Sequence, residues 1–108
     1  MEITRQTNTL YQNIVIHRLK TVEPYFSLVR NGTKNFEVRQ YTAQEDRRSR
    51  DFQVGDVLHL EDVNAPAPEQ PEHRQIVRRK ISYVLKDTDP CMSDKLAPGF
   101  CILGLAPL

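Results

Sequence analysis

The sequence lacks the features that mark several classes of protein. Its two cysteines, Cys91 and Cys101, are too few for a disulfide framework, and its three histidines have no partners at metal-ligand spacing. No apolar run approaches the ~20 residues of a membrane-spanning helix, and no charged-then-apolar leader opens the chain. With a formal net charge of +1, the protein has no overall electrostatic field that would attract nucleic acid or an anionic membrane. We therefore expect a cytoplasmic protein without a metal, another cofactor or membrane contact.

The length and the opening of the chain predict its organisation. A chain of 108 residues is one domain, large enough to bury roughly two-thirds of the surface that its unfolded form exposes. Residues 1–12 are polar and lack a hydrophobic period, so we expect a flexible N-terminal arm. Residues 13–108 contain no repeat and predict a single folded domain.

The hydrophobic pattern predicts one helix and five strands. The helix follows the first strand, with Thr21 as the N-cap, Pro24 in the first turn and Asn31-Gly32 at its end. The expected strands cover residues 14–20, 36–39, 57–61, 75–86 and 100–105. One early helix followed by strands with long loops between them indicates an α+β domain with a five-stranded, barrel-like sheet.

The segment 32–39 places charged residues beside a glycine turn on an otherwise apolar run. Side chains alternate along a strand, so Glu37 and Arg39 share one face while Phe36 and Val38 share the other. We expect the apolar face to pack into the core and the charged face to line a cleft with the preceding lysine. The ordinary alternative is a surface ion pair, which contributes only about a few tenths of a kcal/mol.

The same segment resembles the signature of the ASCH domains, a branch of the PUA-like superfamily, with the pattern Gly-x-Lys-x-x-Glu-x-Arg. The resemblance covers residues 14–105 and includes the run 17–20 before the helix, the run 51–56 and the closing strand. The chain is similar to a small group of ASCH-like proteins common in bacteria and their phages. This resemblance implies a PUA-like, five-stranded mixed β-barrel with one main helix after the first strand.

The resemblance also implies which residues line the cleft. Lys34 would hold an anionic or carbonyl oxygen, Glu37 would accept hydrogen bonds from an amine or ring N–H of a base, and Arg39 would orient Glu37 or reach a phosphate. His17 and Lys20 belong to the matching signature and are expected to face the same cleft. A histidine at such a junction more often packs locally, which is the ordinary alternative.

Neighbouring residues supply further candidates for ligand binding. Residues 41–50 form a polar segment, here called the arginine loop, which we expect to fold over the rim of the cleft. Its candidates for phosphate contacts are Arg47, Arg48 and Arg50, and a solvated loop is the ordinary alternative. Tyr41, just past the signature, is the ring expected to stack on a base.

A second basic cluster lies in the expected strand 75–86, at residues 78–80. Because side chains alternate along a strand, the three cannot all face one partner. Arg78 with Lys80 is the pair that can.

Some small ASCH relatives are amidohydrolases that remove the acyl group of N4-acylated cytidine with a lysine, a threonine and a glutamate. The lysine matches Lys34, whereas Glu37 occupies the place of the threonine, and the neighbouring Thr33 cannot be assumed to replace it. Glu61 is a weak candidate for the family's glutamate. Lys34 and Glu37 are therefore the candidates for catalysis, and the missing nucleophile disfavours this activity.

Three functions remain open at this point. Our prediction is a module that binds RNA or a nucleotide-like small molecule in a cleft floored by Lys34, Glu37 and Arg39. The first alternative is deacylation of a modified pyrimidine nucleoside. The second alternative is a phage- or host-encoded interaction module that binds a protein partner and inhibits it, because a fold does not determine a function.

Overall fold

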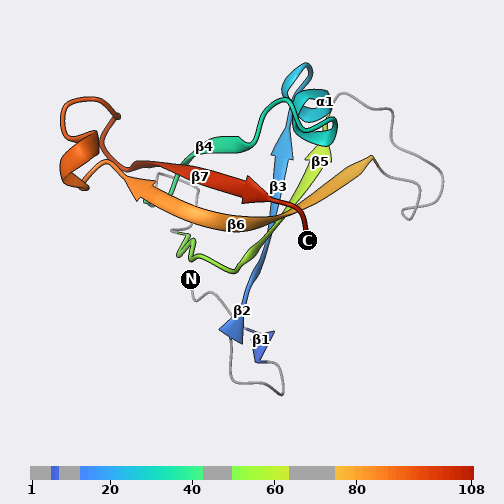
Figure 1. The fold of residues 1–108 in the computed structure, drawn as a ribbon, viewed down its shortest axis with the longest axis horizontal. Helices are drawn as coiled ribbons and strands as arrows, with labels where there is room; N and C mark the ends of the chain where they lie inside the picture. Colours follow the sequence, from blue (N-terminus) through green and yellow to red (C-terminus); the bar gives the residue numbers. More distant parts are fainter. Residues whose placement is uncertain (1–5, 8–12, 43–49, 64–74) are drawn as a thin grey trace.

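The computed structural model describes residues 6–7, 13–42, 50–63 and 75–108 of the chain (Figure 1). Its centre is a five-stranded mixed sheet made of β3 (Ile16–Thr21), β4 (Phe36–Gln40), β5 (Val57–Asp62), β6 (Ile76–Lys86) and β7 (Phe100–Ala106). The order across the sheet is β3-β5-β6-β7-β4. β3 and β5 run parallel, and the other neighbours are antiparallel. The expected strands are confirmed, with small shifts at their ends.

The sheet curls into a half-barrel instead of closing (Figure 1). Residues 76–80 of β6 pair with β5, and its residues 80–86 pair with β7. The pairing of β6 with β7 contains a register shift between Ile81 and Tyr83, and such bulges increase the local twist. Of the described strands, β3 and β4 stand at the two ends of the sheet. The α+β class and the five-stranded mixed sheet are therefore confirmed, whereas the barrel stays open.

The helix is shorter than the sequence predicts. The helix α1 covers Tyr25–Arg30. The prediction that Thr21 is its N-cap is wrong, because Thr21 is the last residue of β3. The first turn is instead held by Glu23, whose carboxylate accepts hydrogen bonds from the backbone N–H and the hydroxyl of Ser27, at 2.9 and 2.5 Å. The predicted end is confirmed, since Gly32 has a positive φ of 85° just after the last turn.

One hydrophobic core lies between the sheet and α1, which packs against β5 and β6. Its buried members are Phe26, Val29, Phe52, Leu58, Leu60, Val77, Ile81, Cys101 and Leu103. From the sheet, Nη2 of Arg79 donates to the carbonyl oxygens of Val29 and Arg30, at 3.2 Å each, and so caps the C-terminal end of α1. Phe26 on α1 and Cys101 on β7 are thus both buried in this core.

The two faces of β4 are the reverse of the predicted ones. Phe36 and Val38 are 39% and 45% exposed, whereas Glu37 is only 3% exposed. Glu37 stands opposite the core residue Leu103 in the register of β4 and β7, and residues directly opposite project on the same face. The predicted alternation is therefore correct, but the charged side chains of β4 point into the curl and the apolar ones point outward.

Three short elements lie outside the main sheet. β1 (Gln6–Thr7) and β2 (Asn13–Ile14) form a small antiparallel pair, so part of the expected N-terminal arm is paired, and the rest of that arm lies outside the described residues. A short 3₁₀ turn, η2 (Pro90–Met92), lies in the loop between β6 and β7, at the far end of the sheet from α1 (Figure 1). None of the helices in the described part of the chain has the length and apolar character that crossing a membrane requires.

Candidate functional site

A pocket, here called the binding pocket, opens between the end of β3, the start of α1 and β4. Its lining residues are Lys20, Thr21, Val22, Tyr25, Lys34, Glu37, Val38 and Arg39. Its volume is about 400 Å³, within the range of ~300–1,000 Å³ that is typical of small-molecule sites. The structure thus brings four of the candidate residues together: Lys20, Lys34, Glu37 and Arg39.

The centre of the pocket is a carboxylate held by two cations. Lys34 Nζ donates to Oε1 of Glu37 at 2.5 Å, and Arg39 Nε donates to Oε2 at 3.1 Å. Nη2 of Arg39 forms an ion pair with the same Oε2 at 3.0 Å. A buried carboxylate is tolerated only when it is paired and hydrogen-bonded. Lys34 and Arg39 are therefore the physical reason that Glu37 can face the inside of the curl.

The turn after α1 positions Lys34. Its backbone N–H donates to the carbonyl oxygen of Leu28 at 2.9 Å, which ties the turn back to the helix. Its ammonium lies 5.7 Å from the ring centroid of Tyr25 and 5.0 Å from that of Phe36, within the range of cation–π attraction. The ammonium is therefore held by two rings and a carboxylate at the wall of the pocket.

Two arginines reach the open edge of β3 beside the pocket. Nη2 of Arg39 donates to the carbonyl oxygen of Lys20 at 3.1 Å, and Nη2 of Arg50 donates to that of Arg18 at 3.4 Å. Partial burial, and then the nearby charge of Arg39, lower the pKa of Arg50. The backbone N–H of Arg50 also donates to the carbonyl oxygen of Tyr41 at 2.9 Å, which brings the two ends of the arginine loop together. The base of this loop therefore lies next to the pocket.

Tyr41, another candidate from the arginine loop, lies away from the pocket. The hydroxyl of Tyr41 donates to Oδ1 of Asp87 at 2.5 Å, and Lys86 Nζ lies 5.0 Å from the centroid of its ring. This hydrogen bond raises the pKa of Tyr41 and lowers the pKa of Asp87. Tyr41 thus anchors the loop between β6 and β7 and is not part of the pocket lining. Arg47 and Arg48 lie outside the described residues.

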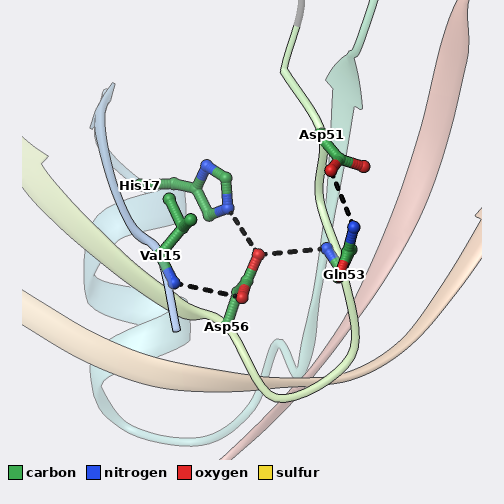
Figure 2. A network of polar contacts seen from close by, with 5 residues as sticks. All are labelled: Val15, His17, Asp51, Gln53 and Asp56. Atoms are coloured by element: carbon green, nitrogen blue, oxygen red, sulfur yellow. Dashed lines mark hydrogen bonds and ion pairs between the residues drawn. The ribbon is translucent and has the colours of Figure 1, made fainter. Parts of the chain in front are cut away.

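His17 is buried on the core side of β3 and does not line the pocket. Figure 2 shows its ring pointing at Asp56, with Nε2 2.9 Å from Oδ2, and both side chains are 1% exposed. The carboxylate of Asp56 also accepts hydrogen bonds from the backbone N–H groups of Val15 and Gln53, at 3.2 Å each. The ring of Phe52 lies 4.7 Å away from the imidazole. His17 therefore joins β3 to the turn before β5, which is the local packing given above as the ordinary alternative.

The pocket is rich in hydrogen-bond donors. Lys20, Lys34 and Arg39 each carry a positive charge, and Glu37 is the one acidic residue of the lining, so the formal charge of the lining is +2. An ammonium has three N–H donors and a guanidinium has five, and none of them accepts a hydrogen bond. Such a lining favours ligands that present negatively charged or carbonyl oxygens.

The aromatic wall of the pocket was missed from the sequence. Tyr25 is 49% exposed and lines the pocket, whereas its neighbour Phe26 is buried in the core. Tyr25 and Phe26 are adjacent aromatic residues, and Tyr25 lies four positions before the buried Val29, so no local signal in the sequence assigns its ring to the pocket. Among the described residues, no group of three or more His, Cys, Asp or Glu side chains is placed to hold a metal ion.

Comparison with known proteins places the chain in a family without assigning it an activity. No curated protein matches the chain. Residues 16–105 match the model of a family described as a domain of unknown function, DUF3850. The match runs from the first residue of β3 into β7 and includes every residue of the binding pocket. The chain belongs to the DUF3850 family of domains of unknown function.

Proposed function

We propose that this protein is a module that binds RNA or a nucleotide-like small molecule in the binding pocket, on a sheet of PUA-like architecture. The observation that carries the proposal is the composition of the pocket: three cations, one buried carboxylate that holds two of them in place, and an exposed tyrosine ring. Nucleotides combine anionic phosphate oxygens with a flat base, and these are the groups that such a lining can bind.

Each residue of the pocket has a distinct part in this proposal. Lys20, Lys34 and Arg39 donate hydrogen bonds to the phosphate or to a carbonyl oxygen of the base. The ring of Tyr25 packs against the base. Both oxygens of Glu37 already accept hydrogen bonds from cations, so we assign it the positioning of Lys34 and Arg39 and not the recognition of a base amine.

A second candidate is the deacylation of an acylated pyrimidine nucleoside, and one observation favours it. Thr21 lines the pocket together with Lys34 and Glu37, so a hydroxyl, an ammonium and a carboxylate share one site. We rank this candidate below binding, because both carboxylate oxygens of Glu37 already accept hydrogen bonds from Lys34 and Arg39.

Isothermal titration calorimetry with the four ribonucleoside 5′-monophosphates and a short oligouridylate tests the binding proposal. We expect Lys34→Ala to weaken binding about tenfold or more, since a charged hydrogen bond contributes ~1.5–3 kcal/mol and 1.4 kcal/mol is tenfold. Glu37→Gln should also weaken binding, because it releases both cations. The control is Lys95→Ala, which removes an exposed lysine from the loop between β6 and β7. Wild-type protein that binds none of the probes, or equal affinity losses in Lys34→Ala and Lys95→Ala, would refute the proposal.

The deacylase is tested in parallel by incubating the protein with N4-acetylcytidine. We expect no turnover at an enzyme-like rate by the wild-type protein. Robust turnover that is lost in both Thr21→Val and Lys34→Ala would instead make the protein a deacylase, because those two changes remove the hydroxyl and the ammonium that the reaction needs.

A further inference from the structure

The outer face of β3, β5 and β6 carries a cluster of exposed basic side chains, here called the basic face. Its four cations are Arg18 and Lys20 on β3 and Arg78 and Lys80 on β6, and all four are exposed. The formal net charge of the whole chain is only +1, so this face concentrates positive charge that is balanced elsewhere. Only Lys20 also belongs to the binding pocket.

The register of the sheet places these cations on one side. Arg18 is opposite His59 on β5, and His59 is opposite Arg78 on β6, so the three form one row across the sheet. Lys20 and Lys80 lie two residues from this row on their strands and therefore project to the same side. Lys20 pairs with Glu61 and Lys80 with Val57, on opposite sides of His59. With strands about 4.8 Å apart and residues about 3.3 Å apart along a strand, the four side chains start from an area of roughly 13 by 10 Å.

The centre of the basic face is a buried histidine that contacts one of the four cations. His59, the middle residue of this row, is buried, and its Nδ1 accepts a hydrogen bond from Nε of Arg78 at 3.2 Å. Burial, and then the charges of Arg78 and Arg18, lower the pKa of His59, so its ring is neutral at pH 7. Glu61, opposite Lys20 in the register, is the acidic residue of this face.

The three basic residues 78–80 project to different sides of β6, and the two sides have different roles. Arg79 projects to the core side of β6, where it caps the end of α1 through the carbonyl oxygens of Val29 and Arg30. Arg78 and Lys80 project to the outer side and are exposed. The two outward cations are therefore available to a partner, while the third stabilises the fold.

We propose that the basic face binds the phosphate backbone of a single-stranded RNA whose neighbouring nucleotide occupies the binding pocket. The charge of the face complements a row of phosphates, and side chains that contact phosphates position a strand without reading its sequence. Lys20 belongs to both surfaces, so a strand can pass from one to the other without leaving the protein. A protein partner is the weaker match, because protein interfaces bury a largely apolar centre, and here the central row is two arginines over a histidine. The inference rests on the proposed function for the choice of RNA as the polyanion.

Fluorescence anisotropy with labelled oligouridylates of four, eight and twelve nucleotides tests the inference over a range of salt concentrations. We expect the twelve-nucleotide probe to bind more tightly than the four-nucleotide probe, because only the longer strand can reach Arg78 and Lys80. The double variant Arg78→Ala/Lys80→Ala should lower the slope of log affinity against log salt by about 1.4, since each contact to a single strand contributes ~0.7. Binding of the four mononucleotides should not change in this variant.

Two controls keep the result interpretable. The variant Arg30→Ala/Lys95→Ala removes the same charge from exposed positions outside the basic face and should keep the wild-type salt slope. Lys80→Ala alone keeps the contact between Arg78 and His59 and should lower the slope by about half as much as the double variant. Far-UV circular dichroism of each variant verifies the fold.

The outcomes separate this inference from the proposed function. Equal salt slopes in the two double variants, or equal affinity for short and long probes, would overturn the basic face as a binding surface while leaving mononucleotide binding intact. Oligouridylate binding that depends on Arg78 and Lys80, without any mononucleotide binding, would support the basic face and refute the pocket. Polyglutamate binding that depends on Arg78 and Lys80, with oligouridylate unaffected, would overturn the choice of RNA in favour of an acidic protein.

Discussion

Replacing Asp56 with alanine is expected to lower the free energy of unfolding by about 3–5 kcal/mol, because it removes a buried carboxylate that accepts three hydrogen bonds. Asp56 and His17 are both 1% exposed, so water does not replace the lost contact in the folded state. The carboxylate accepts from the imidazole at 2.9 Å and from the backbone N–H groups of Val15 and Gln53 at 3.2 Å each (Figure 2). Alanine would leave all three donors without this acceptor.

The magnitude follows from these three contacts. Each buried donor left unsatisfied costs ~1–3 kcal/mol, and partial relaxation of the turn before β5 keeps the total below the sum of the three maxima. A domain of this size has a total stability of about 5–15 kcal/mol, so the change removes a large part of it. Asp56→Asn keeps one acceptor oxygen but turns an amide N–H₂ toward a donor, and we expect a smaller loss than for alanine.

Denaturation by urea, followed by far-UV circular dichroism because the chain has no tryptophan, measures the effect. Asp51 supplies a matched control in the same network: its carboxylate accepts a hydrogen bond from Nε2 of Gln53 at 2.7 Å, but the residue is exposed (Figure 2). Asp51→Asn should change the stability by no more than about 0.5 kcal/mol. A loss below about 1 kcal/mol in Asp56→Ala, less than a buried pair should cost, would refute the reasoning.

Two further predictions concern titratable groups. Burial, and then the charges of Arg78 and Arg18, lower the pKa of His59, so Arg78→Ala should raise it. NMR titration of the ring protons of His59 measures this pKa, and an unchanged value would contradict the prediction. Because the pKa of His59 is lower in the folded protein than in the unfolded chain, the unfolded chain binds a proton there more readily. The stability of the fold should therefore fall as the pH decreases below about 6.5. Burial raises the pKa of Cys101 to about 11, whereas Cys91 is exposed. A thiol reagent at pH 8 should therefore modify Cys91 in the folded protein and Cys101 only on unfolding. Equal modification rates of the two thiols in the folded protein would contradict this.

The alternation of β4 could be predicted from the sequence, but the side that each face occupies could not. Spacing alone shows that Glu37 and Arg39 share a face. Which face enters the core depends on the register with β7 and on the two cations that pair with Glu37, and both are long-range or turn-dependent facts. Burial rules favour Phe36 and Val38 inside, and the ion pairs of Glu37 override them here.

The aromatic residues show the same limit. Tyr25 and Tyr41 both lie close to the segment 32–39 in the sequence, and nothing in the neighbouring residues separates their roles. Tyr41 is removed from the pocket by Asp87, a residue from the distant loop between β6 and β7. Tyr25 is the first residue of α1, and Lys34 Nζ, from the turn after that helix, lies 5.7 Å from the centroid of its ring. Tertiary contacts, and not local patterns, decide which ring is available to a ligand.

The open seam of the half-barrel explains why the pocket lies where it does. β3 and β4 are the two edges of the described sheet, so the carbonyl oxygens on the outer side of β3 have no neighbouring strand there. The side chains of Arg39 and Arg50 donate to two of these oxygens instead. Edge carbonyl groups need partners, and long cationic side chains supply them across a wider gap than a backbone ladder spans. Had β4 paired directly with β3, strands about 4.8 Å apart would leave no room for a pocket of about 400 Å³ between them. Arg39, which donates to the open edge of β3, is therefore also one of the cations that line the pocket.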